Sequence, residues 1–267
     1  MDGQDTTILP DLAEKWEVSQ DGKTYTFTLR KDVKFQNGNP FTAADVKFTL
    51  ERVKDPPKGV ISPRQTAFDP ITSIETPNDY TVVVKLERPY ASLLVNLAQG
   101  WMAVYDKEFV EAKGADAPTK EVMGTGPFLF KKYTRGTEVM REKNPNYWNK
   151  GLPYLDSVKH LIVPDQNTRV AALRTGQVQM LLLNAGDFEK FQKEMGDKMV
   201  FERTGSLGMG SLYTHTPRKP YDNPKVREAL YLAINRHDAI QVLDQGDGQL
   251  GGYMLPGGPW SLSDEEI

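Results

Sequence analysis

The first half of the chain alternates strand-like and helix-like patterns of apolar residues. Residues 24–29 place Tyr25, Phe27 and Leu29 between threonines, which is the period-two pattern of a half-buried strand. The dipeptide Asp21-Gly22 just before them is typical of a tight turn. We therefore predict a strand that follows a turn and buries one face.

A capped helix is predicted next. Thr42 is a helix-capping residue, and Asp45 stands at the reciprocal position of a capping box. Apolar residues recur at helical spacing over 46–53, and Pro56-Pro57 ends the helix. The pattern then predicts strands at 71–74 and 80–86, with a turn at 77–79, and helices around 93–97 and 106–113, the last closed by Gly114.

A different pattern begins at Gly124. It predicts strands at 128–131, 138–141, 158–163, 178–183 and 199–203, with helices at 168–175 and 188–195. The continuous apolar end of the run 178–183 is typical of a parallel sheet covered on both faces. Strands that alternate with helices favour an α/β fold.

A last helix is predicted at 224–235. Asn223 caps it and Pro224 occupies its first position. Its apolar stripe consists of Val226, Leu230, Ala233 and Ile234. Such a stripe has to be buried against a partner.

Composition excludes several classes of protein. The 267 residues carry 33 basic and 36 acidic side chains, for a net charge of −3. The chain therefore lacks the excess of positive charge typical of proteins that bind nucleic acid. It also has no polybasic run that would bind a membrane surface. No apolar run is long enough for a transmembrane helix. The polar segment 1–5 shows no signal peptide, so we expect either a cytosolic protein or a chain that starts after its signal.

Catalytic and metal-binding chemistry finds little support. The chain has no cysteine, and its three histidines, at 160, 215 and 237, lack metal-ligand spacing. No nucleophile elbow occurs, and the Gly124-Thr-Gly126 run lacks the third glycine of a dinucleotide site. We therefore predict no catalytic residue, no metal and no cofactor. An acid–base carboxylate pair stays open, because carboxylates are many.

A long ordered motif carries a family resemblance. It reads Leu12-Ala13-x-x-Trp16-x-x-Ser19-x-Asp21-Gly22-Lys-x-Tyr25-x-Phe27-x-Leu29-Arg30, then Val33-Lys34-Phe35-x-x-Gly38-x-Pro40-x-Thr42-Ala43-x-Asp45-Val46. Further matches are Gly124-Thr-Gly-Pro-Phe128, Asn144-Pro-Asn-Tyr-Trp148, Pro164-Asp165, Ala172-Leu-x-x-Gly176 and Asn223-Pro-x-Val-Arg227. The chain resembles, over essentially its whole length, the bacterial extracellular solute-binding proteins of family 5, which include dipeptide-, oligopeptide- and nickel-binding proteins. Trp16 and Trp148 are expected to be core anchors.

The resemblance implies a periplasmic-binding-protein-like α/β fold of type II, the two-lobed peptide-binding type. Residues 1–11 and 124–213 would form a partial first lobe, 12–123 an inserted side domain, and 214–267 the start of a second lobe. Relatives are longer, so we expect an incomplete chain that is marginally stable, prone to associate and a weak binder when alone.

The resemblance also implies a function. The protein would be the solute-binding component of an ABC importer, in the periplasm or at the cell surface. It would capture a small ligand between two lobes, with a peptide as the first expectation, and deliver it to the permease subunits. It would be no enzyme, would bind no nucleic acid and would be a monomer when full length. A nickel chelate, an oligosaccharide or an opine are alternative ligands; a hydrolase and a stand-alone interaction module are alternative functions.

Three stretches match positions that form the first lobe's wall of the cleft in this family. The first holds Gln99, Trp101 and Met102, where Trp101 offers a flat apolar face unless it is simply core. The second holds Gly208, Met209 and Ser211, a close backbone approach or a hinge strand. The third holds Arg64 and Gln65, where Arg64 would pair with a ligand carboxylate unless it is a solvated surface residue.

Overall fold

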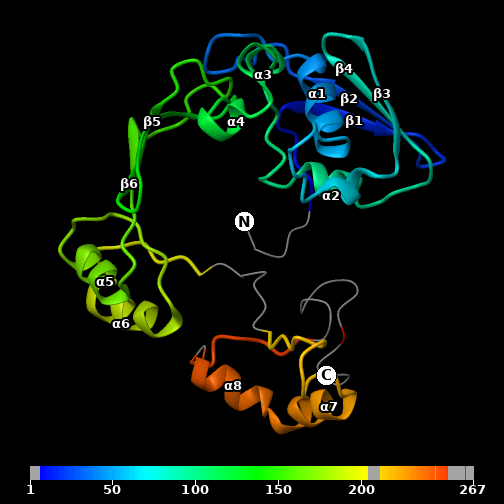
Figure 1. Ribbon diagram of the computed structural model, residues 1–267. Coiled ribbons are helices and arrows are strands. Elements are labelled where there is room, and N and C mark those ends of the chain that lie inside the picture. Colours follow the sequence, from blue (N-terminus) through cyan, green and yellow to red (C-terminus); the bar gives the residue numbers. More distant parts are fainter. Residues whose placement is uncertain (1–6, 204–210, 244, 252–261, 263–267) are drawn as a thin grey trace. The chain divides into compact units, whose positions relative to one another are not determined.

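The computed structural model describes residues 7–203, 211–243, 245–251 and 262 (Figure 1). The chain divides into two compact units, one of Thr7–Val163 and one that holds the described residues from Pro164 onward. The assignment of 1–11 with 124–213, of 12–123 and of 214–267 to separate domains stays a prediction.

The first unit contains a four-stranded antiparallel sheet. Its strands are β1 (Ala13–Val18), β2 (Thr24–Leu29), β3 (Ile71–Asn78) and β4 (Thr81–Leu86), in the order β1-β2-β4-β3. The predicted strand 24–29 is confirmed at both ends, and the two strands around residues 77–79 are confirmed. No pattern predicted β1, which pairs with β2 through the hairpin at Asp21-Gly22.

Helix α1 (Ala43–Lys54) packs against this sheet, as Figure 1 shows. The predicted capping box is confirmed, since the Asp45 carboxylate accepts hydrogen bonds from the backbone N (2.8 Å) and the hydroxyl (3.0 Å) of Thr42. The buried core of the unit comprises Tyr25, Leu29, Val33, Phe35, Phe41, Ala43, Leu50, Phe68, Ile71, Ile74, Val82, Val84, Leu86 and Leu93. Helix and sheet thus share one continuous apolar layer.

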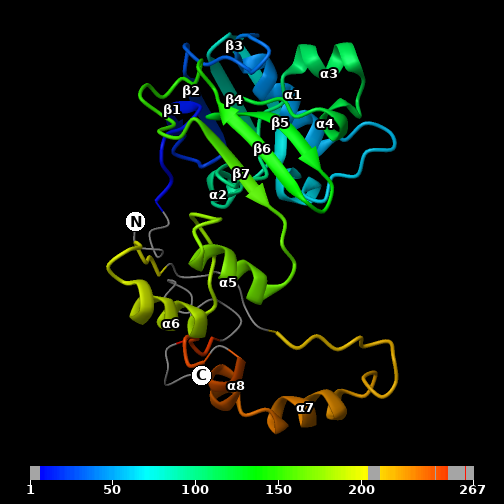
Figure 2. The ribbon, with the colours of Figure 1, turned by 90° about the vertical axis from the view of Figure 1, so that its left-hand side faces the viewer.

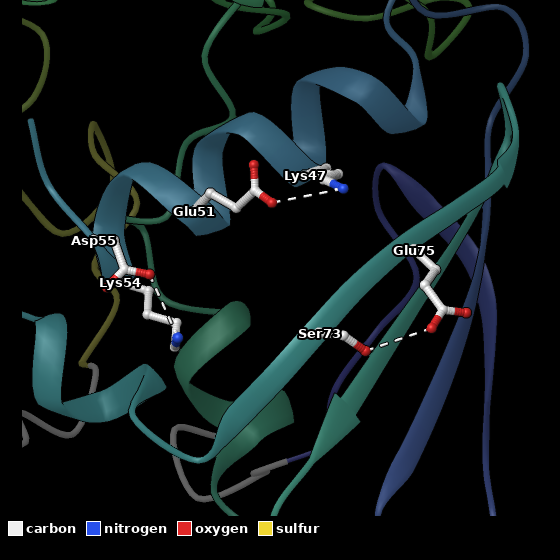
Figure 3. Close-up of polar contacts among 6 residues, drawn as sticks. All are labelled: Lys47, Glu51, Lys54, Asp55, Ser73 and Glu75. Atoms are coloured by element: carbon white, nitrogen blue, oxygen red, sulfur yellow. Dashed lines mark hydrogen bonds and ion pairs between the residues drawn. The ribbon is translucent and has the colours of Figure 1, made fainter.

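The outer surface of α1 carries charged side chains in local pairs (Figure 3). Lys47 pairs with Glu51 at 3.6 Å, one helical turn away, and Lys54 with Asp55 at 3.4 Å. On β3, Ser73 bonds Glu75, whose other partner is Lys85 of β4. Exposed pairs of this kind add at most about 1 kcal/mol each.

The two core-anchor predictions for tryptophan have different outcomes. Trp148 is half-buried and packs against the core, as predicted. Trp16 is half-buried opposite Phe27 on β1 and β2, but it is not among the residues that pack against the core. That part of the prediction is wrong: β1 is an edge strand, paired only with β2 in the described sheet.

Short helices follow the sheet. They are η1 (Gln65–Phe68), α2 (Leu93–Leu97), α3 (Lys107–Lys113) and α4 (Ala117–Lys120). The predicted helix 106–113 is confirmed, with the Asp106 side chain accepting from the Phe109 amide as its cap. Gly114 closes it at φ 98°, a left-handed conformation that favours glycine.

A buried polar network joins α3 to the loop before α1. Asp106 is 1% exposed, and its carboxylate accepts from the side-chain amides of Asn37 (2.6 Å) and Asn39 (2.9 Å). Asp45 accepts from the backbone N of Lys107 at 2.9 Å. Because both buried carboxylates are surrounded by donors, their burial costs much less than that of unpaired charges.

A second, three-stranded sheet lies in the same unit (Figure 2). Strands β5 (Phe128–Thr134), β6 (Glu138–Lys143) and β7 (Ser157–Leu161) are antiparallel, in that order, and confirm the three predicted strands. Gln36 joins this sheet to the rest of the unit: its backbone N donates to the Gly124 carbonyl (3.0 Å) and its side chain to the Phe128 carbonyl (2.9 Å).

The second unit is described as four helices: α5 (Gln166–Arg174), α6 (Ala185–Met195), α7 (Pro224–Ala233) and α8 (Arg236–Leu243). Asp165, Asn184 and Asn223 cap the first three through their side chains. The predicted helices 168–175, 188–195 and 224–235 are therefore confirmed to within a few residues. In α7 no residue is buried by the described chain.

Two predicted strands of this unit are wrong. Residues 178–183 and 199–203 form no strand, and Met180 and Leu182 are 83% and 86% exposed. A short apolar run becomes a strand only where another strand pairs with it, and none of the described residues of this unit provides one. Both described sheets are antiparallel, so the parallel sheet expected from the alternating pattern is also absent from the described residues.

Candidate ligand-binding site

Two of the three predicted wall segments meet on the surface of the first unit. Arg64 precedes η1, and Trp101 lies in the loop after α2. The Arg64 guanidinium carbon lies 5.0 Å from the centroid of the Trp101 ring, within cation–π range. Residues far apart in the sequence thus form one aromatic and cationic surface.

Phe68 fixes the position of Trp101 from below. It is 0% exposed, and its ring lies 6.3 Å from that of Trp101 at an interplanar angle of 77°, an edge-to-face contact. Phe68 and Arg64 are four residues apart on the η1 turn, so one short helix supplies both contacts to the indole. Phe68 was missed from the sequence; its spacing from Arg64 is the signal that could have identified it.

Exposure separates the two interpretations of Trp101. The side chain is 38% exposed, so it is not a core residue, although Phe68 beneath it is. Arg64 is exposed, and no hydrogen bond or ion pair of the described residues involves its guanidinium. The surface therefore offers a supported aromatic ring and a cation whose five N–H donors lack a protein partner.

The other predicted site residues are less informative. Gln99 donates to the Val95 carbonyl at 3.3 Å, Gln65 is exposed at the start of η1, and Met102 packs against the core. Ser211 is exposed and belongs to the second unit. Gly208 and Met209 lie outside the described residues.

A shallow hollow beside α3 and α4 is a weaker candidate. It is lined by Tyr105, Asp106, Phe109, Val110, Pro118, Glu121, Val122 and Met123. Its two carboxylates are already engaged, Asp106 by asparagines and Glu121 by Lys113 at 2.7 Å. Neither carboxylate is therefore free to orient a polar ligand.

Carboxyl groups with shifted pKa values have structural causes. Ion pairs with Lys159 and Lys132, at 2.8 and 2.9 Å, hold the pKa of Glu138 below its usual range. Hydrogen bonds from Thr168 lower the pKa of Asp165 at the start of α5. Among the described residues no group of three or more His, Cys, Asp or Glu could hold a metal ion. The same part of the chain contains no helix with the length and apolarity needed to cross a membrane.

Comparison with known proteins identifies the family. The family model described as "Bacterial extracellular solute-binding proteins, family 5 Middle" matches residues 7–267. Heme-binding protein A of Haemophilus influenzae is 33% identical over 280 residues, covering 97% of this chain and 51% of that protein.

Two solved structures share the fold. One is AgaA from A. tumefacien R10 in complex with agropinic acid, with a TM-score of 0.81, 34% identity and coverage of 99% of this chain and 53% of that one. The other is a dipeptide-binding protein from Pseudoalteromonas sp. SM9913 in complex with Met-Leu, with a TM-score of 0.78, 30% identity and coverage of 91% and 51%.

These matches confirm the predicted periplasmic-binding-protein fold class. The chain spans about half the length of the relatives that it matches. The chain belongs to the bacterial extracellular solute-binding proteins of family 5.

Proposed function

We propose that this chain contributes one wall of the ligand site in the solute-binding component of an ABC importer. The protein would work in the periplasm or at the cell surface, bind a small solute as a monomer and deliver it to the permease subunits. The observation that carries the proposal is the contact of Arg64 with the face of Trp101, whose ring makes an edge-to-face contact with the buried Phe68. The family of this chain consists of extracellular solute-binding proteins.

The proposed wall is built mainly from the first unit. Trp101 and Arg64 would contact ligand, and Gln65, Gln99 and Met102 would flank them. Gly208, Met209 and Ser211 would contribute from the chain that follows. We also propose that 12–123 is a side domain on a first lobe of 1–11 and 124–213, and that a second lobe begins at 214.

Binding without catalysis fits the chemistry of this surface. An indole and a guanidinium orient a ligand and neutralise its charge, but neither is a nucleophile or exchanges a proton near neutral pH. The relatives named above are a heme-binding protein, a structure with agropinic acid and a structure with the dipeptide Met-Leu. We propose a peptide as the ligand, with an opine as the principal alternative.

Isothermal titration calorimetry on the protein with both lobes tests the proposal, with Met-Leu, agropinic acid and hemin as probes. We expect saturable one-to-one binding of at least one probe and no change in its chemical identity after long incubation. Trp16→Phe is the matched control, because Trp16 lies on β1, outside the proposed wall. Failure of all three probes to bind, or turnover of a probe, would contradict the proposed function.

A further inference from the structure

The contact between Arg64 and Trp101 determines which parts of the two side chains a ligand can reach. The guanidinium already covers the indole at 5.0 Å, and the buried Phe68 ring holds the indole from another side. A ligand that approaches this surface therefore meets the N–H edges of Arg64 as well as the exposed part of the indole. The flat apolar face expected of Trp101 alone does not describe this arrangement.

The donors of Arg64 have no other use among the described residues. Asp69 ends η1 only five positions later, yet no ion pair joins it to Arg64. By contrast, Arg52 lies 5.6 Å from the Tyr105 ring and donates to the Ala115 carbonyl, and Arg203 stacks on Phe188 and pairs with Asp247 at 2.7 Å. These arginines use the ring and a polar partner together, whereas Arg64 uses only the ring.

A guanidinium held over an aromatic ring is well prepared to bind an oxyanion. The contact with the ring occupies none of the N–H donors, and two of them match the two oxygens of a carboxylate. The contact with Trp101 also restricts the long side chain before ligand arrives, which reduces the entropy lost on binding. A neutral amide or ester in the same place cannot accept both bonds with full charge.

We propose that Arg64, held on Trp101, is the specificity-determining residue of this site and selects solutes that present a carboxylate. The proposal rests on the proposed function and deepens it by naming the ligand group that the wall recognises. Trp101 contacts the ligand and also holds the guanidinium, and Phe68 is a positioning residue that acts through Trp101.

Calorimetry with matched acid and neutral probes, again on the protein with both lobes, tests the proposal. The pairs are Met-Leu and its carboxyl-terminal amide, agropinic acid and its methyl ester, and hemin and its dimethyl ester. For a probe that binds, we expect the acid to bind about 10- to 100-fold more tightly than its neutral counterpart, the range for a charge-assisted hydrogen-bonded contact. Arg64→Gln should weaken the acid by a similar factor and leave the neutral form unchanged, and Arg64→Lys should recover only part of the preference, because lysine keeps the charge but loses the planar fork.

Arg88→Gln is the matched control. Arg88 is also exposed and lies 5.9 Å from an aromatic ring, that of Tyr90, and no hydrogen bond or ion pair of the described residues involves its side chain. This variant should keep the wild-type preference for acids. Binding without a preference for the acid, or a preference that persists in Arg64→Gln, would overturn this inference and leave the proposed function standing. Absence of binding by all the acid probes would overturn both.

Discussion

Two arginine–tryptophan stacks in the first unit have nearly the same composition and very different surroundings. Arg30 lies 4.1 Å from the centroid of the Trp148 ring, and Arg64 lies 5.0 Å from that of Trp101. Arg30 also donates to the Asp11 carbonyl at 2.8 Å and pairs with Glu14 at 3.6 Å. Arg64 has no such partner among the described residues.

The two tryptophans differ in the same direction. Trp148 packs against the core and against Tyr147, with ring centroids 5.3 Å apart, whereas Trp101 is 38% exposed above Phe68. Arg30 contacts Trp148, which lies before β7, and bonds Asp11 and Glu14 in and beside β1. It therefore holds these two segments together. The same two residue types therefore build a structural clamp when their donors are satisfied internally, and a binding surface when the donors are left open.

The largest effect should come from Trp148→Ala. Removing the ring leaves a cavity beside the core and takes away the support of Arg30, so the free energy of unfolding should fall by about 2–4 kcal/mol. This is below the range for a fully buried tryptophan because Trp148 is half-buried. Urea denaturation followed by circular dichroism measures the loss, and a loss under about 1 kcal/mol would remove the distinction between the stacks.

Trp101→Ala should weaken ligand binding and leave the stability of the fold almost unchanged. In the protein with both lobes, we expect ligand binding to weaken by about 1–3 kcal/mol, as for an aromatic anchor at a binding hot spot. The free energy of unfolding should change by less than about 1 kcal/mol, because the ring is partly exposed already. Calorimetry and urea denaturation on the same variant separate the two quantities. Lost stability with unchanged affinity would assign Trp101 to the core.

The arginines themselves sharpen the comparison at smaller scale. Arg30→Gln removes a stack, a hydrogen bond and a weak ion pair, and should lower the free energy of unfolding by about 1–2 kcal/mol. Arg64→Gln removes only an exposed stack and should cost about 0.5 kcal/mol or less. Equal losses for the two variants, measured by urea denaturation, would show that the polar partners of Arg30 add nothing.

The smallest effect concerns alkaline pH. Burial, and then the Asp11 carboxylate, raise the pKa of Tyr147 above its ordinary value of 10.0. Because the folded state holds this proton more tightly than the unfolded state, the stabilisation is complete below the ordinary pKa and is lost as pH rises through the raised value. The free energy of unfolding should therefore fall less between about pH 8 and about pH 11 in Tyr147→Phe than in the wild type. An identical pH dependence would contradict the assignment.

Local signals in the sequence predicted the first unit well. The threonine alternation of β2, the capping box of Thr42 and Asp45 and the glycine stop of α3 depend on neighbouring residues alone, and the structure has all three. Strand β1 was missed because its pattern AEKWEV does not alternate; its existence depends on pairing with β2. The run 178–183 failed for the converse reason, since apolar character alone does not supply a partner strand.

The candidate site was predictable only in part. Family resemblance selected the segments of Arg64 and Trp101, but no periodicity links residues so far apart in the sequence. Their contact depends on how η1 and the loop after α2 pack over Phe68, which is a tertiary property. For the same reason, the sequence around Arg64 is by itself that of an ordinary surface residue.

The asparagine pair on Asp106 also governs how the molecule ages chemically. Asn37 precedes Gly38, and an Asn-Gly step cyclises readily because glycine offers little steric resistance to attack by its own backbone nitrogen. In the folded chain the Asn37 amide nitrogen is held by Asp106 at 2.6 Å while its oxygen accepts from the backbone of Asn39. Deamidation would replace that donor with a second carboxylate facing a buried one, a like-charge contact that favours opening of the loop. The hydrogen bonds that the fold gives Asn37 therefore have to break before a reaction whose product would loosen this loop.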